Sequence, residues 1–313
     1  MQCWADIYAS AVSRIKIHRV LAKNKAENAF NSYLMKYPDL KKLYDERRLL
    51  VLEIAKENLK KTGKKAKEKY SQLSEKLRDK INELNIDKDE ILPKYDCEKC
   101  KDVGFINGTP CECLNKRIYD LQLKNNGFNS EELPTFETVK FDIVKDKKEK
   151  EIQAGADNVL EKIVTKDSKY KLVSIFGGVG VGKTHMLKCV FEKAVRNNMF
   201  SIYTTSFDLN QKMLEYQCAK IDEKKQILKP YLEADVLCID DLGTENHINN
   251  VTTEYYYLIL DERTSKNKKT FLTTNLNLEQ IRDIYDDRIF SRLCSNINAL
   301  KLNIEGSDLR LKK

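Results

Sequence analysis

The chain has 313 residues, of which 41% are hydrophobic and 33% charged, and its formal net charge is +8. This length suffices for about two domains, and the spread-out excess of positive charge fits an acidic partner or a solvated lysine-rich surface, not a dedicated basic tail. Apolar runs stay short of the roughly 18 residues that a membrane span needs, and segment 1–20 lacks the apolar core of a signal peptide, so we expect no membrane association.

Residues 1–92 are predicted to form a helical region. Asp39 is placed to cap a helix just after Pro38, and Thr62-Gly63 interrupts the helical pattern. Apolar residues recur at helical spacing on either side of this break, at Leu40, Leu43, Leu50, Val51 and Ile54 and then at Ala66, Tyr70, Leu73, Leu77, Ile81 and Leu84. Two amphipathic helices around a glycine turn predict an antiparallel hairpin, which either packs on its own domain or offers a face to a partner protein.

Residues 93–130 contain a compact cysteine-rich module with its linker. Cys97 and Cys100 form one close pair, and Cys111 and Cys113 form a second. Four thiolates in two pairs suit a tetrahedral, structural Zn²⁺ site, with a redox pair, unrelated surface thiols or an iron–sulfur cluster as alternatives. The other five cysteines are scattered, several of them within apolar runs, which suits a reducing cytosol and predicts a cytoplasmic protein.

Residues 131–313 alternate between strand-like and helix-like runs. The predicted strands are Leu172–Phe176, Phe200–Thr205, Val236–Asp240, Thr270–Asn275 and Ala299–Ile304. Such alternation predicts an α/β domain whose parallel sheet lies between helices.

A glycine-rich G-x-x-x-x-G-K-T segment connects the first of these strands to a helix-like run, His185 to Arg196. Its glycines allow backbone N–H groups to surround phosphate oxygens, and the helix N-terminus faces the same anion. Lys183 would reach the β- and γ-phosphates of ATP, while the Thr184 hydroxyl would bind Mg²⁺. The predicted nucleotide-binding residues are Gly177, Gly178, Gly180, Gly182, Lys183, Thr184 and His185.

The strand Val236–Asp240 ends in two carboxylates, about fifty residues after Lys183, which is a usual interval for a Walker B strand. We expect Asp240 to hold Mg²⁺ through water and Asp241 to orient or activate the attacking water. Many ATPases of this type have Glu at the second position, and Glu245 is an alternative for that role.

Polar and basic residues follow the later strands. Asn275 ends the run Thr270–Asn275, where its amide can bind the attacking water or the γ-phosphate. Arg288 and Arg292 lie four residues apart on one helix face, and either can stabilise the γ-phosphate of a neighbouring copy or pair with a local aspartate instead. Arg310 is a candidate nucleotide-sensing arginine. The run Tyr255–Leu260 is expected to pack a helix on the sheet.

This ordered set of motifs resembles the AAA+ ATPases of the DnaC/DnaI helicase-loader group, with the transposition helper ATPase IstB as a relative. The resemblance covers Leu133 to Lys313, and Tyr95–Leu114 is similar to the zinc module of many Gram-positive and phage-type loaders. It implies an AAA+ P-loop core in which Asp240 serves Mg²⁺, Asn275 is sensor 1 and Arg310 is sensor 2. Arg292 would be the finger acting in trans, a role for which Arg288 competes.

The resemblance also implies a function, the ATP-dependent loading of a hexameric replicative helicase onto single-stranded DNA. Region 1–92 would bind the helicase, and the ATPase domain, residues 131–313, would self-associate and hydrolyse ATP with Mg²⁺. Segment Phe207–Lys229 supplies Lys212, Lys220, Lys224, Lys225 and Lys229 with Phe207 and Tyr216, either as a DNA contact or as an ordinary wet helix face. The alternatives are an IstB-like transposition helper and an ATP-binding clamp with little turnover, the latter because of the short Asp241.

Overall fold

The computed structural model describes residues 2–58, 64–131, 133–139, 144, 146–165, 167–248, 251–295 and 297–311. These residues form two compact units. The helical unit comprises Val12–Leu114, and the sheet unit comprises Met1–Ala11 together with Asn115–Lys313. None of the described helices combines the length and the apolarity that a membrane crossing requires.

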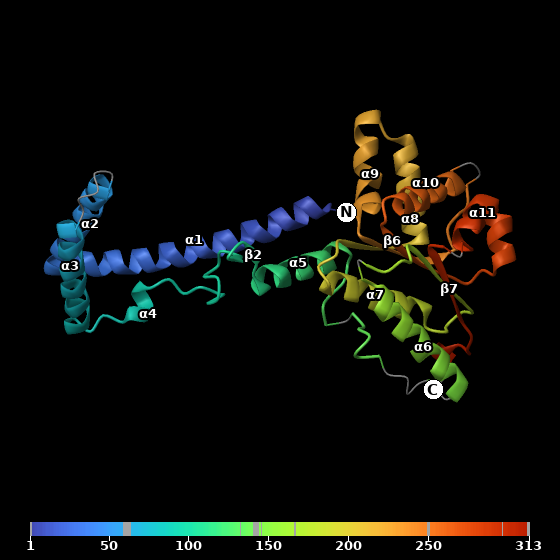
Figure 1. Cartoon of the computed structure of the whole chain (residues 1–313), viewed down its shortest axis with the longest axis horizontal. Coiled ribbons are helices and arrows are strands. Elements are labelled where there is room, and N and C mark those ends of the chain that lie inside the picture. Colours follow the sequence, from blue (N-terminus) through green and yellow to red (C-terminus); the bar gives the residue numbers. More distant parts are fainter. Residues whose placement is uncertain are drawn as a thin grey trace. The chain divides into compact units, whose positions relative to one another are not determined.

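The helical unit contains most of α1 (Trp4–Lys36), a helix of 33 residues, followed by α2 (Pro38–Asn58), α3 (Lys64–Glu83) and the short α4 (Lys88–Ile91). Helices α2 and α3 pack against each other (Figure 1). A small core joins them to the end of α1, with Leu34, Leu40, Leu77 and Ile86 buried. The predicted pair of amphipathic helices is therefore present, whereas the break at Thr62-Gly63 lies outside the described residues.

The start of α2 differs from the prediction that Asp39 caps it. The helix begins at Pro38 itself, so Asp39 lies in its first turn. Proline is favoured at the first helical position because it has no N–H to leave unsatisfied and its φ is already helical. The Asp39 carboxylate instead faces the positive end of the helix dipole.

The sheet unit is built on a five-stranded sheet in the order β4-β5-β6-β3-β7. The strands are β3 (Leu172–Gly177), β4 (Ser201–Thr205), β5 (Val236–Leu242), β6 (Lys269–Thr274) and β7 (Ala299–Ile304). Every neighbouring pair is parallel. All five predicted strands are present, and their ends differ from the prediction by at most two residues.

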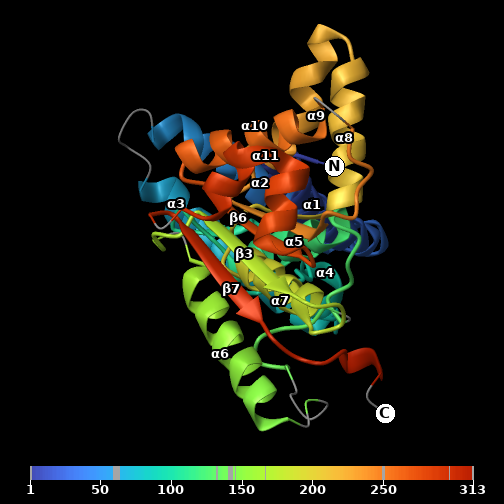
Figure 2. The same cartoon turned by 90° about the vertical axis from the view of Figure 1, so that its right-hand side faces the viewer.

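Helices cover both faces of the sheet. Figures 1 and 2 show α6 (Lys147–Ile163) and α7 (Lys183–Arg196) on one face, and α8 (Ser206–Cys218), α10 (Thr252–Ser265) and α11 (Leu278–Leu293) on the other. The handedness of βαβ connections explains this division, since nearly all such crossovers are right-handed. The chain runs through α7 from β3 to the far edge strand β4, and then returns across the sheet through α8, α9 (Ile221–Glu233), α10 and α11.

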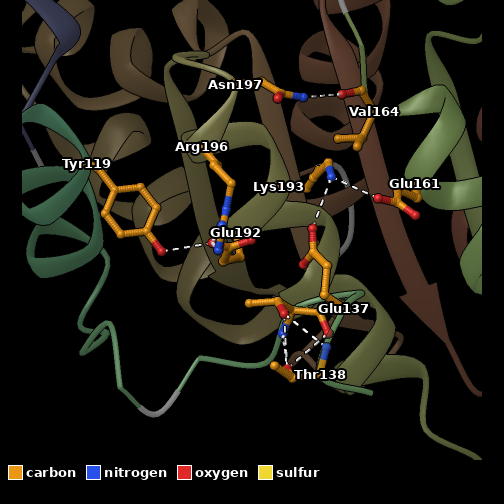
Figure 3. Close-up of polar contacts among 10 residues, drawn as sticks. Tyr119, Glu137, Thr138, Glu161, Val164, Glu192, Lys193, Arg196 and Asn197 are labelled. Carbon is orange, nitrogen blue, oxygen red and sulfur yellow. Dashed lines mark hydrogen bonds and ion pairs between the residues drawn. The ribbon is translucent and has the colours of Figure 1, made fainter. Parts of the chain in front are cut away.

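Polar contacts fasten helix α7 to its neighbours (Figure 3). Lys193 donates to Glu161 of α6 at 2.8 Å and to Glu137 of the preceding loop at 3.3 Å. At the adjacent position, the buried Glu192 accepts from Arg196 and from Tyr119, which belongs to α5 (Glu112–Asn125). These bonds hold α5, α6 and the loop before α6 around the helix that follows the glycine-rich segment.

Candidate nucleotide-binding site

A cavity of about 640 Å³ opens beside the glycine-rich loop, at the edge of the sheet where the strands end. In open α/β sheets, this edge is the usual ligand site. The cavity gathers eight predicted residues from four separate parts of the chain, namely Gly180, Gly182, Lys183, Thr184, His185, Asp241, Asn275 and Arg310.

The loop itself requires glycine for its backbone path. Gly180 and Gly182 have φ values of +76° and +96°, which side chains rarely adopt. A Cβ at Gly177 would lie 2.5 Å from the backbone oxygen of Ile304. The path turns the chain sharply from β3 into α7, so that the helix N-terminus faces the cavity.

Lys183 is buried and joins the loop to the end of β6. Its Nζ donates to the backbone oxygens of Gly177 at 3.0 Å and Gly178 at 2.6 Å, and to Asn275 Oδ1 at 2.6 Å. Burial lowers the pKa of the ammonium group, while the carboxylates of Asp241 and Asp240 oppose that shift. The predicted pair Lys183 and Asn275, which are far apart in sequence, is thus in direct contact.

Asp240 is 5% exposed and accepts three hydroxyl groups. Thr184 and Thr273 donate to Oδ1 at 3.1 and 2.6 Å, and Tyr203 donates to Oδ2 at 2.6 Å. The contact with Thr184 brings together the two residues predicted to serve Mg²⁺. Tyr203 was not predicted, because a tyrosine within a strand resembles an ordinary sheet residue.

Asp241 lines the cavity in an unusual backbone conformation, with a φ of +57°. It lies at an irregularity in the pairing of β5 with β6, and its N–H donates to Thr273 Oγ1 at 2.8 Å. Burial raises the pKa of its carboxyl group, and the neighbouring Asp240 raises it further. Strained conformations of this kind concentrate at functional sites.

Glu245 is not available as a substitute for Asp241. It is 7% exposed and points into the protein, where its carboxylate accepts from Ser206 and Tyr285. The backbone N–H of Gly243 also donates to it, at 2.9 Å. These hydrogen bonds connect the loop after β5 to α8 and α11, so the Glu245 carboxylate has a structural role.

The C-terminal segment carries Arg310 to the cavity. The backbone N–H of Leu309 donates to the oxygen of Gly180 at 3.0 Å. Asp308 accepts from the Arg310 N–H at 2.9 Å, and Glu149 of α6 accepts from the Ser307 hydroxyl at 3.0 Å. Arg310 is exposed and lines the cavity together with Lys183.

Arg288 and Arg292 lie away from this cavity, on the second half of α11. The helix is interrupted at Asp286, which has non-helical angles of φ 75° and ψ 172°. Arg288 pairs with Glu254 of α10 at 2.6 Å and with Asp286 itself. Arg292 pairs with Asp261 of α10. The alternative of a local aspartate partner thus applies to Arg288, through Asp286, while Arg292 pairs with the neighbouring helix.

A second unpredicted residue, Asp157 of α6, lines the part of the cavity beyond the loop. It is 8% exposed, and among the described residues its Oδ1 has no hydrogen-bond partner. Burial raises the pKa of Asp157 to about 6, and the nearby Glu161 adds to the effect. Pro134 and Val139 line the same region. No sequence signal distinguishes Asp157 from the other charged residues of α6.

The four cysteines of the predicted module lie together in the helical unit. Their sulfur atoms are all within 4.8 Å of one another, with Cys97–Cys111 at 3.8 Å and Cys100–Cys113 at 3.4 Å. Tetrahedral Zn–S bonds of 2.3 Å place sulfurs about 3.8 Å apart, so the set fits Zn²⁺. Burial alone would raise the pKa of Cys100, but hydrogen bonds from the Gly104 N–H and neighbouring thiols lower it to about 7.

A short hairpin of β1 (Phe105–Ile106) and β2 (Thr109–Pro110) carries the second cysteine pair back to the first. Gly104 and Gly108 have φ values of +84° and +81°, a region that glycine adopts readily in such turns. Buried Asp102 accepts from the backbone N–H groups of Asp96 and Cys97 at 3.0 and 2.9 Å. The segment 96–102, which carries the first cysteine pair, is therefore closed by its own hydrogen bonds.

Helices α8 and α9, which carry the predicted lysine-rich segment, lie side by side in both views (Figures 1 and 2). Lys212 pairs with Glu215 at 2.6 Å. The ring of Tyr216 packs edge-on against Tyr255, and Lys224 lies over its face. Three of the predicted residues, Lys212, Tyr216 and Lys224, thus have partners within the chain, and Lys229 pairs with Glu233 at 4.0 Å. Phe207, in contrast, is 46% exposed, and Lys220 is exposed. The side chain of Lys225 lies outside the described residues.

Comparison with known proteins places these features in context. Residues 136–299, just over half of the chain, match the family described as the bacterial DnaA ATPase domain. A chromosomal replication initiator protein DnaA from Borrelia garinii subsp. bavariensis is 28% identical over 133 residues, covering 42% of this chain and 27% of that protein. The chain thus spans about a quarter of the length of the curated DnaA proteins that it matches.

Two solved structures are similar to this chain. AMPPCP-bound DnaA from Aquifex aeolicus is 23% identical with a TM-score of 0.43, covering 54% of this chain and 49% of that one. A DnaC helicase loader is 19% identical with a TM-score of 0.45, covering 54% of this chain and 96% of that one. Taken with the AAA+ arrangement of the sheet unit, the family match over residues 136–299 shows that this chain belongs to the bacterial DnaA ATPase-domain family.

Proposed function

We propose that this chain is an ATPase that loads a hexameric replicative helicase onto single-stranded DNA during replication initiation. The observation that carries the proposal is the cavity in which Lys183, Asp241 and Arg310 converge, in a member of the bacterial DnaA ATPase-domain family. The curated DnaA proteins that it matches are chromosomal replication initiators by name. The order of the motifs, together with an N-terminal helical region and a cysteine module, favours a helicase loader within replication.

The residues around the cavity suit ATP binding and hydrolysis. Lys183 would exchange its bonds to the Gly177 and Gly178 oxygens for bonds to phosphate oxygens. Asp241 would accept the proton of the attacking water, and Asn275 would orient that water. Arg310 is close enough to Lys183 to lower its pKa, so it would add positive charge at the same phosphates.

Two metal sites belong to the proposal. Thr184 and Asp240 fit Mg²⁺, because their hydroxyl and carboxylate oxygens are hard ligands 3.1 Å apart at the edge of the cavity. When bound, Mg²⁺ would neutralise charge on the phosphate oxygens. The four clustered cysteines would hold Zn²⁺ and stabilise a module with little core of its own.

Partner binding would divide between the two units. In the helical unit, Ile17, Val20 and Leu21 are 54%, 54% and 61% exposed and share one face of α1. Such an apolar stripe suits a protein partner, and we assign region 1–92 to the helicase, region 93–130 to the zinc module and region 131–313 to ATPase activity. Self-association of the ATPase domain would bring Arg292 of one copy to the ATP of its neighbour.

Phosphate release by the wild type and by Lys183→Ala, with single-stranded DNA and helicase present, tests the enzymatic part. The wild type should turn over ATP and the variant should not. Equal phosphate release from both proteins would contradict ATPase activity at this site. The chain would then be a nucleotide-binding clamp or would have no function with ATP.

A pull-down with purified proteins tests the partner. Capture of a replicative helicase in an ATP-dependent manner supports the loader, and capture of a transposase instead would support an IstB-like helper.

A further inference from the structure

The site contains a residue that neither its motifs nor its resemblance assigns, Tyr203 of β4. Its hydroxyl donates to Asp240 Oδ2 at 2.6 Å. The other carboxylate oxygen, Oδ1, accepts from Thr184 and Thr273. Among the described residues, Tyr203 is therefore the side chain that fixes Oδ2, and its bond decides how the carboxylate is rotated about its last torsion.

The ring of Tyr203 packs against two phenylalanine rings. Phe128 meets it edge-on with ring centres 5.1 Å apart, and Phe191 of α7 meets it at 6.0 Å. Phe128 and Phe191 also contact each other at 5.3 Å. Aromatic packing of this kind restricts the ring to one orientation, so its hydroxyl has a defined position.

The backbone of Tyr203 is held as well. Strand β4 lies at the edge of the sheet, and an edge strand has unpaired N–H and C=O groups. Here Asn126 Oδ1 accepts from the Tyr203 N–H at 2.8 Å, and Gln122 Oε1 accepts from the Ser201 N–H at 3.0 Å. Two side-chain amides at the end of α5 thus replace a neighbouring strand and fix β4 where Tyr203 projects toward Asp240.

We propose that Tyr203 is a positioning residue for Mg²⁺, which orients the Asp240 carboxylate so that one oxygen faces the metal and its waters. The inference rests on the proposed function, because it presumes that Thr184 and Asp240 serve Mg²⁺ there. Groups that hydrogen-bond a metal-binding carboxylate set its direction, and their loss typically lowers metal affinity by about 10- to 100-fold. Tyr203 does not touch the nucleotide in this scheme.

The test measures the affinity for a fluorescent ADP analogue as Mg²⁺ is titrated, and again in EDTA. Tyr203→Phe should bind the analogue in EDTA as the wild type does, but need about tenfold or more Mg²⁺ for the half-maximal gain in affinity. Tyr119→Phe is the matched control, because it also removes a tyrosine-to-carboxylate bond, that to Glu192 at 2.9 Å, away from Asp240 (Figure 3). It should leave the Mg²⁺ requirement unchanged.

The outcomes separate the two proposals. A wild type that binds no analogue under either condition defeats the proposed function itself. A wild type that binds it, with the same Mg²⁺ requirement in all three proteins or with no Mg²⁺ effect, overturns only the role of Tyr203.

A measurement that keeps the Tyr203 hydroxyl covers the case in which Tyr203→Phe does not fold. Fluorotyrosine placed at position 203 should change its fluorine NMR shift when Mg²⁺ is added to the ADP complex, and fluorotyrosine at position 119 should not. Unchanged shifts at both positions count against the proposal.

Discussion

The guanidinium of Arg292 lies over the ring of Tyr257, 4.5 Å from its centre, and pairs with Asp261 on the same helix, α10. The ring of Tyr257 also receives Arg288, at 5.0 Å. Both arginines are therefore held on an exposed surface of α10 and α11, away from the chain's own cavity. An arginine in this position serves catalysis only if it reaches the ATP of a neighbouring copy.

If Arg292 acts in trans, Arg292→Ala should lower ATP turnover by about a thousandfold while leaving ATP binding intact. Mixing the Arg292→Ala protein with the equally inactive Lys183→Ala protein should restore activity. In a random head-to-tail assembly of the two, roughly a quarter of the interfaces combine an intact Lys183 with an intact Arg292. Phosphate release from the mixture is the measurement. Mixtures made with Arg288→Ala decide which arginine acts, and an inactive Arg292 mixture excludes the trans role.

Asn275→Ala should separate binding from hydrolysis. The substitution removes an acceptor of Lys183 and the amide expected to orient water, so turnover should fall by about 100-fold or more. The affinity for ATP should change little, because the loop and Lys183 remain. Single-turnover hydrolysis and equilibrium binding measure the two effects. Asn303→Ala, at an exposed position of β7, is the control and should alter neither. An equal loss of binding and turnover in Asn275→Ala would contradict the assigned role.

Local patterns sufficed to predict the sheet and the cavity, because strand and loop motifs are contiguous in sequence. The glycine loop, Asn275 and Arg310 each follow a strand, and Asp240 lies near the C-terminal end of β5. Parallel strands bring these ends to one edge of the sheet. The positions of the basic residues depend on tertiary packing instead. Arg288 and Arg292 pair with Glu254 and Asp261 of α10, and these partners lie too far away in sequence for a local pattern to indicate the pairing.

Buried polar groups were the hardest to predict. Glu245 lies only four residues after Asp241 and has suitable chemistry, yet a turn at Gly243 directs it inward to Ser206 and Tyr285. Tyr203 shows the opposite error. Its position in a strand suggests an ordinary sheet residue, but its hydroxyl bonds to Asp240 in the site. At the end of a strand, turns and bulges decide which face of the sheet a side chain lies on. The alternation of polar and apolar residues in the sequence does not indicate those turns and bulges.

Asp157 should make stability depend on pH in the acidic range. Its folded-state pKa of about 6 lies above the ordinary 3.8, so the folded state keeps its proton longer than the unfolded state as pH rises. The free energy of unfolding should therefore decrease as the pH rises from 4 to 6, by at most about 3 kcal/mol for a pKa shift of this size. Asp157→Asn should remove that cost and raise the Tm at pH 7.5 but not at pH 4.

Exposed Asp120 of α5 provides the control for Asp157. Asp120→Asn should change stability by less than about 0.5 kcal/mol at either pH. Thermal melts of the three proteins across the pH range decide the matter. An Asp157→Asn protein that is less stable than the wild type at pH 7.5 would show that the carboxylate has a partner it needs.

The cysteine cluster should hold one Zn²⁺ per chain, measured by mass spectrometry of the metal. Cys100→Ser should abolish that metal and unfold the β1–β2 hairpin, because the loop has little apolar core of its own. Cys294→Ser, which lies outside the cluster, should retain it. Visible absorption from bound iron and sulfide in the purified protein would instead indicate an iron–sulfur cluster.

Single-stranded DNA should bind to α8 and α9 through the cations that are not paired with a neighbouring carboxylate. Lys220 is exposed at the start of α9 and Lys224 contacts only the Tyr216 ring in the described contacts, whereas Lys212 already pairs with Glu215. Each of Lys220→Ala and Lys224→Ala should reduce the slope of log affinity against log salt by about one. Lys212→Ala should change it less, because the Lys212 ammonium already pairs with Glu215 and so is not free to neutralise a phosphate. Affinity for oligonucleotide that is independent of salt in the wild type would exclude a phosphate contact on these helices.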